Sequence, residues 1–441
     1  MNNNTSQMSY SKAGLLPFLI CGVGAFFYVY EFFLRVMPSA MTDELMRSFQ
    51  IDAGGLGVLS AFFYYGYTPM QIPAGLLLDR YGPRILLSLS MMVCAVGALA
   101  FGLTNSAIVA SMARLFIGLV SAFAFVGALV LATRWFAARY FALIVGLIQL
   151  MGCIGAIVGE APVAIMVQHI GWRSTMFWSA GVGAIFAILF WVIIRDRPEG
   201  DRDSTAHTEH QPNELQRLSQ VVKNPQTWTV GLYAFACWAP IAIFADLWGI
   251  PYLKLFYNTS VATAATAIAV VWIGIAVAGP VVGWWSNKIA NRRTPLLLCS
   301  ILGLISSLFI LYVPGLPWPF MYLALFVFGA AASSQAVSFG LVQDNNHISV
   351  AGTAVGFNNM AVILGGLLFQ PLVGFILNNL WDGTIINGLH FYSLENYRSA
   401  LILLPICSVI GIFASIFLVK ETHCQPQFSE PTSNLAYDLQ K

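Results

Sequence analysis

The chain has 441 residues, of which 58% are hydrophobic and only 9% are charged. A soluble protein carries about 25% charged residues, because its surface must face water, so the composition excludes that class and indicates a polytopic membrane protein. The formal net charge is +2, and the basic residues form no stripe of the kind that a nucleic-acid partner needs.

The N-terminal residues MNNNTSQMSYSK are polar, and the apolar run that follows them is too long for the core of a signal peptide. We therefore interpret that run as a retained first span. Of the seven cysteines, all but Cys424 fall within apolar runs, without the paired spacing of a disulfide framework or a metal cluster. The sequence predicts neither a metal site nor a cofactor.

Apolar runs long enough to cross a membrane recur along the whole chain. A bilayer-spanning helix needs roughly 20 mostly apolar residues, and counting such runs predicts an all-α protein with 12 transmembrane helices. The predicted spans are residues 15–40, 54–78, 85–103, 107–133, 140–166, 173–194, 227–250, 259–285, 295–313, 318–341, 351–378 and 398–419.

The longest polar segment of the chain lies within residues 195–224, between the sixth and seventh predicted spans. We predict that it links two six-helix halves, residues 1–194 and residues 225–419, and that residues 420–441 form a tail. Most of the 21 Lys and Arg residues fall on the side of the membrane that holds both termini and this linker. That asymmetry predicts that both termini are cytoplasmic. The basic residues on the opposite side are Arg47, Arg173, Lys254 and Arg398.

The two halves repeat each other in sequence. GLLLDRYGPR (75–84) follows the second span, and GWWSNKIANR (283–292) follows the eighth span with the same layout. The fifth and eleventh spans also align, which places Gln149 opposite Asn359. Internal duplication of a six-span unit is typical of transporters, because alternating access works by rocking one repeat against the other.

GLLLDRYGPR resembles the loop motif of the major facilitator superfamily, Gly-x-Leu-x-Asp-Arg-x-Gly-x-Arg. In that family the loop joins the second and third spans on the cytoplasmic side, as the predicted topology has it here. The resemblance implies two pseudo-symmetric six-helix halves and a conformational latch, whose arginines pair with carboxylates or helix C-termini. The latch residues that it implies are Gly75, Asp79, Arg80, Gly82 and Arg84.

Further segments extend the resemblance over the whole chain. Arg114 lies in ARLFIGL, which is similar to the family's Arg-x-x-x-Gly signature in the fourth span. RWFAARYFALIVGL and GWRSTMFW resemble the branch that carries organic anions and related solutes. In the second copy of the loop motif Asn287 stands in place of Asp79, as is usual for the family's second half.

The fifth span departs from the pattern of the family's antiporters, which typically carry a Gly-Pro pair there. The segment GCIGAIVGEAP (152–162) keeps the glycine spacing, but Glu160 and Ala161 come before Pro162. This departure favours a symporter over an exporter of drugs or metabolites.

Four ionisable residues are predicted inside the membrane: Glu31, Arg35, Arg114 and Glu160. A charge at mid-bilayer costs at least about 2.5–3.5 kcal/mol on insertion scales, so each needs a partner or a wet cavity. Glu31 and Arg35 share one helix face, and the family fold places the first and fourth spans on the central cavity. We expect Arg35 and Arg114 to bind an anionic group of the substrate and Glu31 to take the coupled proton.

Structural interpretations of these residues stay open. Glu31 and an arginine could form an ion pair that merely tolerates burial, and Glu160 is either a second proton-coupling residue or a contact to a neighbouring helix. Tyr28, Gln149 and Asn359 are predicted substrate contacts; the alternative for such polar residues is a helix-to-helix hydrogen bond. For Asp246, near the outer end of the seventh span, a place at the membrane–water interface is favoured.

Together these features predict a secondary active transporter that moves a small polar organic solute, such as an organic anion, amino acid or peptide-like molecule, by alternating access. We expect proton-coupled symport by a monomer in the plasma (inner) membrane, with the substrate, protons and the lipid bilayer as partners. The alternatives are an exporter or antiporter of siderophores or drugs, and a transporter-like membrane sensor. No clustered nucleophile or metal set in the spans indicates an enzyme.

Overall fold

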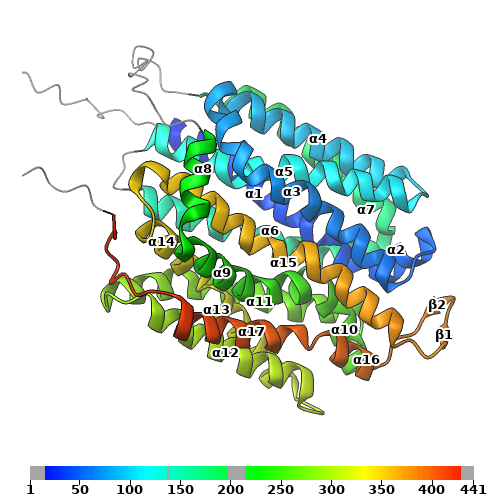
Figure 1. Ribbon diagram of the computed structural model, residues 1–441. Helices are drawn as coiled ribbons and strands as arrows, with labels where there is room; N and C mark the ends of the chain where they lie inside the picture. The colour runs from blue at the N-terminus through cyan, green and yellow to red at the C-terminus, as the bar shows by residue number, and fades with distance from the viewer. Residues whose placement is uncertain (1–14, 137–139, 197–213, 429–441) are drawn as a thin grey trace, which may run out of the picture.

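The apolar runs fold into long helices that lie alongside one another in a bundle (Figure 1). The computed structural model describes residues 15–136, 140–196 and 214–428. The described chain ends and α8 (Glu214–Lys223) lie at one end of the bundle, which we call the linker end. The opposite end, the far end, carries α2 (Thr42–Phe49), α10 (Gly249–Tyr257), α16 (Leu394–Ala400) and a hairpin of β1 (Ile385–Ile386) and β2 (Leu389–His390).

Residues 16–193, which we call the N-terminal half, contain one broken span and five long helices. The first span changes from α-helix to a 3₁₀ turn at Met37, next to Pro38, whose ring cannot donate a backbone hydrogen bond. Besides α2, the elements are α1 (Leu16–Val36), η1 (Met37–Met41), α3 (Ala53–Tyr81), α4 (Pro83–Leu103), α5 (Ala107–Trp135), α6 (Phe141–Ile170) and α7 (Trp172–Ile193).

Residues 225–418, the C-terminal half, repeat this plan. The seventh span is also broken, here by a π-helical turn, η3 (Phe244–Trp248), between α9 (Pro225–Ile243) and α10. The remaining elements are α11 (Val261–Lys288), α12 (Arg293–Tyr312), α13 (Trp318–Ala332), α14 (Gln335–Asp344), η4 (Ile348–Val350), α15 (Ala351–Asn379), α17 (Leu403–Phe413) and η5 (Ala414–Leu418).

In the described residues, 11 helical segments are long and apolar enough to cross a membrane. The predicted second span corresponds to α3, which is not among these 11 but is 29 residues long and packs in the bundle against α5 and α15. The predicted all-helical membrane fold is therefore confirmed, apart from the short hairpin between α15 and α16. The boundaries of the predicted halves, linker and tail as domains stay a prediction.

The two halves meet most tightly at the far end. There α3 crosses α15 so closely that a Cβ at Gly57 would lie 2.5 Å from the carbonyl oxygen of Gln370, and a Cβ at Gly374 would lie 2.2 Å from that of Ala53. Small residues at helix crossings allow such backbone contact. Toward the linker end, a Cβ at Gly75 in the same helix would meet nothing within 4 Å among the described residues.

Polar contacts also close the far end. The Nζ atom of Lys254 in α10 lies 2.5 Å from Oδ2 of Asp43 in α2. The backbone N–H of Ala53 donates to the Tyr392 hydroxyl at 3.2 Å. Both contacts join the N-terminal half to the C-terminal half, so the structure is closed at the far end.

Candidate functional site

Glu31 and Arg35 form a buried ion pair on α1. Arg35 Nε donates to Oε1 of Glu31 at 2.9 Å, and its Nη2 donates to the same oxygen. The guanidinium carbon lies 4.2 Å from the ring centroid of Phe32 and 5.2 Å from that of Tyr67. Aromatic faces attract a cation, so the pair and the rings together hold Arg35 in one place.

Arg35 borders a cavity between the two halves, together with three of the other predicted substrate residues: Tyr28, Gln149 and Asn359. The cavity measures about 20 Å³, which is room for about one water molecule. The Tyr28 hydroxyl donates to Gln149 Oε1 at 3.5 Å. Asn359 Nδ2 donates across the half-interface to Gln71 Oε1 at 2.6 Å. The sequence repeat that aligned Gln149 with Asn359 thus leads to two amides on one cavity.

Arg114 is placed differently from Arg35. Its Nη1 donates to the carbonyl oxygen of Leu34 at 2.6 Å, and its Nη2 donates to that of Arg35 at 3.2 Å. These are carbonyls of the last turn of α1, which lack helical partners where a helix ends. Arg114 therefore supports the end of the helix that carries Arg35. It borders a separate cavity of about 10 Å³ beside Pro38, and its predicted contact with substrate stays a prediction.

Glu160 joins the two halves through a single hydrogen bond. The indole Nε1 of Trp272 in α11 donates to its Oε1 at 2.8 Å, and both side chains are fully buried. The second oxygen of Glu160 is buried without a partner among the described residues. This contact is the one to a neighbouring helix that the sequence offered as an alternative to proton coupling. Proton binding at Oε2 of Glu160 stays a prediction.

Asp246 lies in the core rather than at the membrane–water interface, where the sequence placed it. The carboxylate is 2% exposed and accepts a hydrogen bond from the Tyr64 hydroxyl of α3 at Oδ2. Arg35 and Arg114 are near enough to act on its charge. The interface interpretation was wrong because η3 packs against η1 and α1 of the N-terminal half, a contact that no local pattern around Asp246 displays.

The predicted latch loop is held by the end of α7. Gly82 has a φ of +80°, and a Cβ there would lie 2.7 Å from Oδ1 of Asp196, so a larger residue would be both strained and too close. The backbone N–H of Arg84 donates to the same oxygen at 2.9 Å, and Arg84 Nε donates to the carbonyl of Trp191 at 2.9 Å. Asp196 is therefore a loop-binding residue that the sequence did not single out.

The other predicted latch residues make fewer described contacts. The Arg80 guanidinium lies 5.2 Å from the ring centroid of Tyr81, and a Cβ at Gly75 would meet no atom of the described residues within 4 Å. The side chain of Asp79 lies outside the described part of the structure. The latch between the halves stays a prediction.

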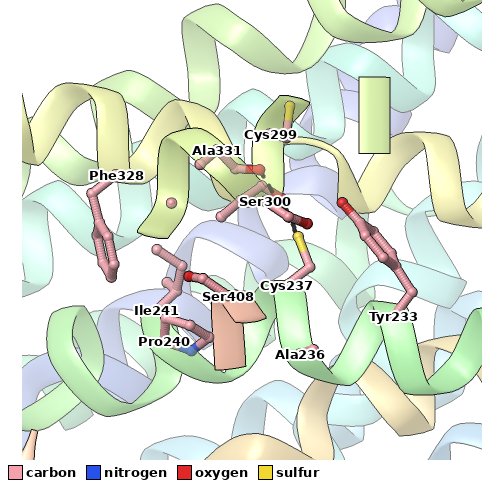
Figure 2. A pocket seen from close by; sticks show the side chains of 12 residues that line it. Tyr233, Ala236, Cys237, Pro240, Ile241, Cys299, Ser300, Phe328, Ala331 and Ser408 are labelled. Carbon is pink, nitrogen blue, oxygen red and sulfur yellow. Dashed lines mark hydrogen bonds between the residues drawn. The ribbon is translucent and has the colours of Figure 1, made fainter. Parts of the chain in front are cut away.

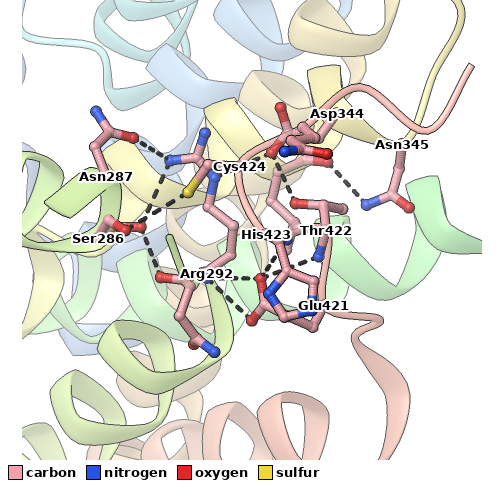
Figure 3. Close-up of polar contacts among 12 residues, drawn as sticks. Ser286, Asn287, Arg292, Asp344, Asn345, Glu421, Thr422, His423 and Cys424 are labelled. Carbon is pink, nitrogen blue, oxygen red and sulfur yellow. Dashed lines mark hydrogen bonds and ion pairs between the residues drawn. The ribbon is translucent and has the colours of Figure 1, made fainter. Parts of the chain in front are cut away.

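In the second half, carboxylates from other segments surround the loop that lacks an aspartate at Asn287 (Figure 3). Arg292 Nε donates to Asp344 Oδ2 at 3.0 Å, and its Nη1 donates to Asn287 Oδ1 at 3.0 Å. Glu421, after the last span, accepts the backbone N–H groups of Arg292 and Arg293 at 2.8–3.0 Å. The start of the predicted C-terminal tail is thus fixed to this loop.

Hydrogen bonding determines the charge state of Glu421. Burial raises the pKa of its carboxyl group, but backbone N–H groups of Arg292, Arg293, His423 and Thr422 donate to it, and the net pKa is lowered from the ordinary glutamate value. The carboxylate form is favoured because each of these donors stabilises a negative charge. The tail is therefore attached through a charged group.

A further cavity of about 20 Å³ lies inside the C-terminal half (Figure 2). Hydroxyl and thiol groups border it, and its Tyr233 hydroxyl lies 2.7 Å from the Ser334 hydroxyl and donates to the Leu296 carbonyl at 3.0 Å. None of its lining residues is charged. This cavity lacks the cation that an anionic substrate requires, whereas the cavity beside Arg35 has one.

The sequence profile of the Major Facilitator Superfamily matches residues 19–370 and, overlapping them, residues 249–432. The chain belongs to this superfamily. The resemblance seen in the loop motif is thereby confirmed, and the chain is a multi-pass membrane protein of a transporter superfamily rather than an enzyme.

Among superfamily members, the chain is similar to proteins named for transport and for sensing. It is 24% identical to the membrane sensor protein UhpC of Salmonella typhimurium, over 90% of this chain and 91% of that protein. It is 23% identical to the hexuronate transporter of Escherichia coli, over 90% of this chain and 95% of that protein. The probable galactarate/D-glucarate transporter GudP of Escherichia coli is 21% identical, over 88% and 90% of the two chains.

Solved structures of transporters share the fold at low sequence identity. A bacterial homologue of the human lysosomal transporter Spinster, solved in an inward-facing and unoccupied conformation, has a TM-score of 0.74 and 16% identity. It covers 92% of this chain and 98% of its own. The nucleoside transporter NupG has a TM-score of 0.69 and 14% identity, over 91% and 98% of the two chains. These likenesses show the fold alone.

Proposed function

We propose that this superfamily member is a proton-coupled symporter of small organic anions, with sugar acids as the first class to test. The observation that carries the proposal is Arg35, a buried guanidinium beside a cavity between the two halves. A planar guanidinium binds a carboxylate through paired hydrogen bonds. The relatives named for hexuronate, galactarate and glucarate transport support a hydroxylated acid as cargo.

The other cavity groups suit the rest of such a molecule. Tyr28, Gln149 and Asn359 present a hydroxyl group and two amides to the same space as Arg35. Amide and hydroxyl side chains both donate and accept hydrogen bonds, so they can pair with the hydroxyl groups of a sugar acid. The cavity holds about one water molecule as described, so binding requires the halves to separate around it.

Charge balance supports coupling to protons. Glu31 and Asp246 are the carboxyl groups that interact with Arg35 and Arg114, so these four buried groups, when all are ionised, carry two charges of each sign. A bound carboxylate adds one negative charge, and an unpaired buried charge is costly. Uptake of one proton restores the balance. The predicted proton carriers, Glu31 and Glu160, and the newly located Asp246 are the candidate sites.

We also propose the predicted orientation, with both termini and the linker cytoplasmic in the inner membrane. The excess of Lys and Arg residues at the linker end supports it. The far end then faces outward. Because the halves meet most tightly there, the described conformation is closed to the outside.

The test is uptake into vesicles that contain the purified protein. A proton gradient directed into the vesicles, with the more acidic solution outside, should drive accumulation of radiolabelled D-glucuronate but not of neutral glucose. Arg35→Lys should raise the half-saturating concentration at least tenfold, because an ammonium ion cannot reproduce the planar fork. Arg173→Lys is the matched control, since Arg173 binds the Thr104 carbonyl and Asn105 away from the cavity. Equal effects of the two substitutions, or uptake of glucose alone, would contradict the proposal.

A membrane sensor is the second candidate, and the similarity to proteins named UhpC favours it. A sensor should bind sugar acids or related anions through the same cavity yet show no uptake in vesicles. Ligand-induced thermal stabilisation without transport would therefore favour the sensor. Binding raises apparent stability by mass action whether or not the ligand crosses the membrane.

A further inference from the structure

We propose that Asp246 is the proton-sensitive contact that keeps the two halves closed at the far side of the cavity, and that protonation of its carboxylate releases this closure. The inference rests on the proposed function, because it names the carboxylate through which the coupled proton acts. It assigns to the seventh span a positioning role that the sequence did not predict.

The contact joins the halves through Tyr64. The Tyr64 hydroxyl of α3 donates to Asp246 Oδ2 in η3, and both side chains are at least 98% buried. Tyr64 is seated against Gly366 of α15, where a Cβ would lie 2.4 Å from its ring. The contact of Tyr64 with the C-terminal half therefore depends on Gly366 as well as on the carboxylate of Asp246.

The second oxygen of Asp246 is left open. Oδ1 is buried and has no hydrogen-bond partner among the described residues. A buried polar atom without a partner is costly, and a proton on this oxygen neutralises the carboxyl group without breaking the bond at Oδ2. Asp246 also lies in a π-helical turn, a feature that is frequent at functional sites.

The charges that face Asp246 belong to the N-terminal half: Arg35 and Glu31 on α1, Arg114 on α5 and Glu160 on α6, besides the Tyr64 hydroxyl. An ionised Asp246 is attracted by the two arginines, and this attraction pulls the halves together. A neutral carboxyl group loses that attraction. Its bond to Tyr64 also becomes a neutral hydrogen bond, which is roughly half as strong as a charge-assisted one.

The other two carboxylates that are fully buried, Glu31 and Glu160, cannot play this part. Glu31 is paired with Arg35 on the same helix, so its protonation breaks no bond between the halves. Glu160 does reach across the interface, but its partner there is the neutral indole of Trp272. Among the described carboxylates in the spans, Asp246 is the one whose charge attracts arginines of the opposite half.

This arrangement also yields the coupling rule of a symporter. In the empty protein, ionised Asp246 supplies the negative charge beside Arg35 that closes the far end. When Asp246 is protonated, a substrate carboxylate on Arg35 can supply that charge instead. The protein with a proton but no substrate then stays open outward and leaks no protons. Substrate beside an ionised Asp246 places two negative charges close together, which is unfavourable.

The experiment measures the far end directly, in full-length protein without substrate. Spin labels are attached to Arg47→Cys in α2 and Thr263→Cys in α11, exposed positions at the far end of opposite halves, after replacement of the native cysteines. Distances between the labels are recorded in lipid nanodiscs at pH 8 and pH 5. We expect the ratio of open to closed protein to rise about tenfold at pH 5, which equals about 1.4 kcal/mol.

Three variants identify the group responsible. Asp246→Asn should be as open at pH 8 as the unsubstituted protein is at pH 5 and should not respond to pH. Tyr64→Phe should also be more open at pH 8, which keeps the test valid if Asp246→Asn does not fold. Glu31→Gln should keep the response. A response retained by Asp246→Asn, lost in Glu31→Gln, unchanged in Tyr64→Phe, or absent from the start would overturn the inference.

Failure of this inference can be told from failure of the proposed function. If a proton gradient drives vesicle uptake of D-glucuronate but the distance between the spin labels does not change with pH, the role of Asp246 is refuted. The proposal of a symporter is then unaffected. A far end that opens in acid and is closed again by D-glucuronate would support both. Opening in acid without any uptake of carboxylates would support the contact and contradict the transport proposal.

Discussion

Arg114→Lys should destabilise the protein more than it weakens substrate binding, whereas Arg35→Lys should do the reverse. Arg114 donates from two nitrogens to the carbonyls of Leu34 and Arg35. A hydrogen bond to a charged group is worth about 1.5–3 kcal/mol. Lysine lacks the rigid fork and can keep one of these bonds, so the free energy of unfolding should fall by about 1.5–3 kcal/mol.

Arg35→Lys keeps a cation beside Glu31 but loses the planar group that stacks on Phe32. Its free energy of unfolding should change less than that of Arg114→Lys, while its affinity for D-glucuronate should fall at least tenfold. The two quantities are measured on the same detergent-solubilised samples, by denaturant titration followed through tryptophan fluorescence and by equilibrium binding. Arg173→Lys again serves as the control for both.

The outcome decides between two roles, substrate binding and support of α1, that could not be separated from the residue pattern alone. If Arg114→Lys weakens binding tenfold at unchanged stability, Arg114 contacts the substrate directly, and its carbonyl contacts in the described conformation are incidental. If both variants lose stability and binding in equal measure, the assignment of substrate binding to Arg35 and of structural support to Arg114 is refuted.

Three further predictions concern the loops and the orientation. Glu421→Gln and Asp196→Asn should each lower the free energy of unfolding by about 1 kcal/mol, as a charge-assisted bond becomes a neutral one; exposed Glu395→Gln is the control. The pKa of Glu421 is lowered on folding. Its contribution to the free energy of unfolding is therefore present above the pKa of the unfolded state, about 4.3, and is lost as pH falls through the pKa of the folded state. Lower protection of residues 421–427 from hydrogen exchange at the lower pH would show this loss. Thr384→Cys should react with an impermeant thiol reagent outside intact cells, and Cys424 should not; the opposite pattern would reverse the topology.

The spans could be predicted from the sequence because bilayer thickness sets the length of an apolar run. The pair of Glu31 and Arg35 was also accessible, since residues four apart on a helix are neighbours by geometry alone. The repeat added more: aligning the fifth and eleventh spans singled out Gln149 and Asn359, and the structure places both on the cavity beside Arg35. These features depend on local spacing or on internal duplication.

What the sequence missed depends on contacts between distant segments. Asp246 meets Tyr64 across 182 residues, and Arg84 meets Asp196 across 112 residues. No periodicity within either segment encodes such a pairing. For Arg114 the sequence indicated the burial of a charge correctly, but the partners are main-chain carbonyls, which every residue carries and which therefore leave no mark in the sequence.

The loss of the acidic residue at Asn287 has a structural explanation in the repeat. In the first half, the backbone N–H of Arg84 donates to Asp196, in the segment after the sixth span. In the second half, the equivalent N–H of Arg292 donates to Glu421, after the twelfth span. Each loop is thus bound to the segment that ends its own half. Since Asp344 also pairs with the Arg292 guanidinium, the second loop keeps an acidic partner without a carboxylate of its own.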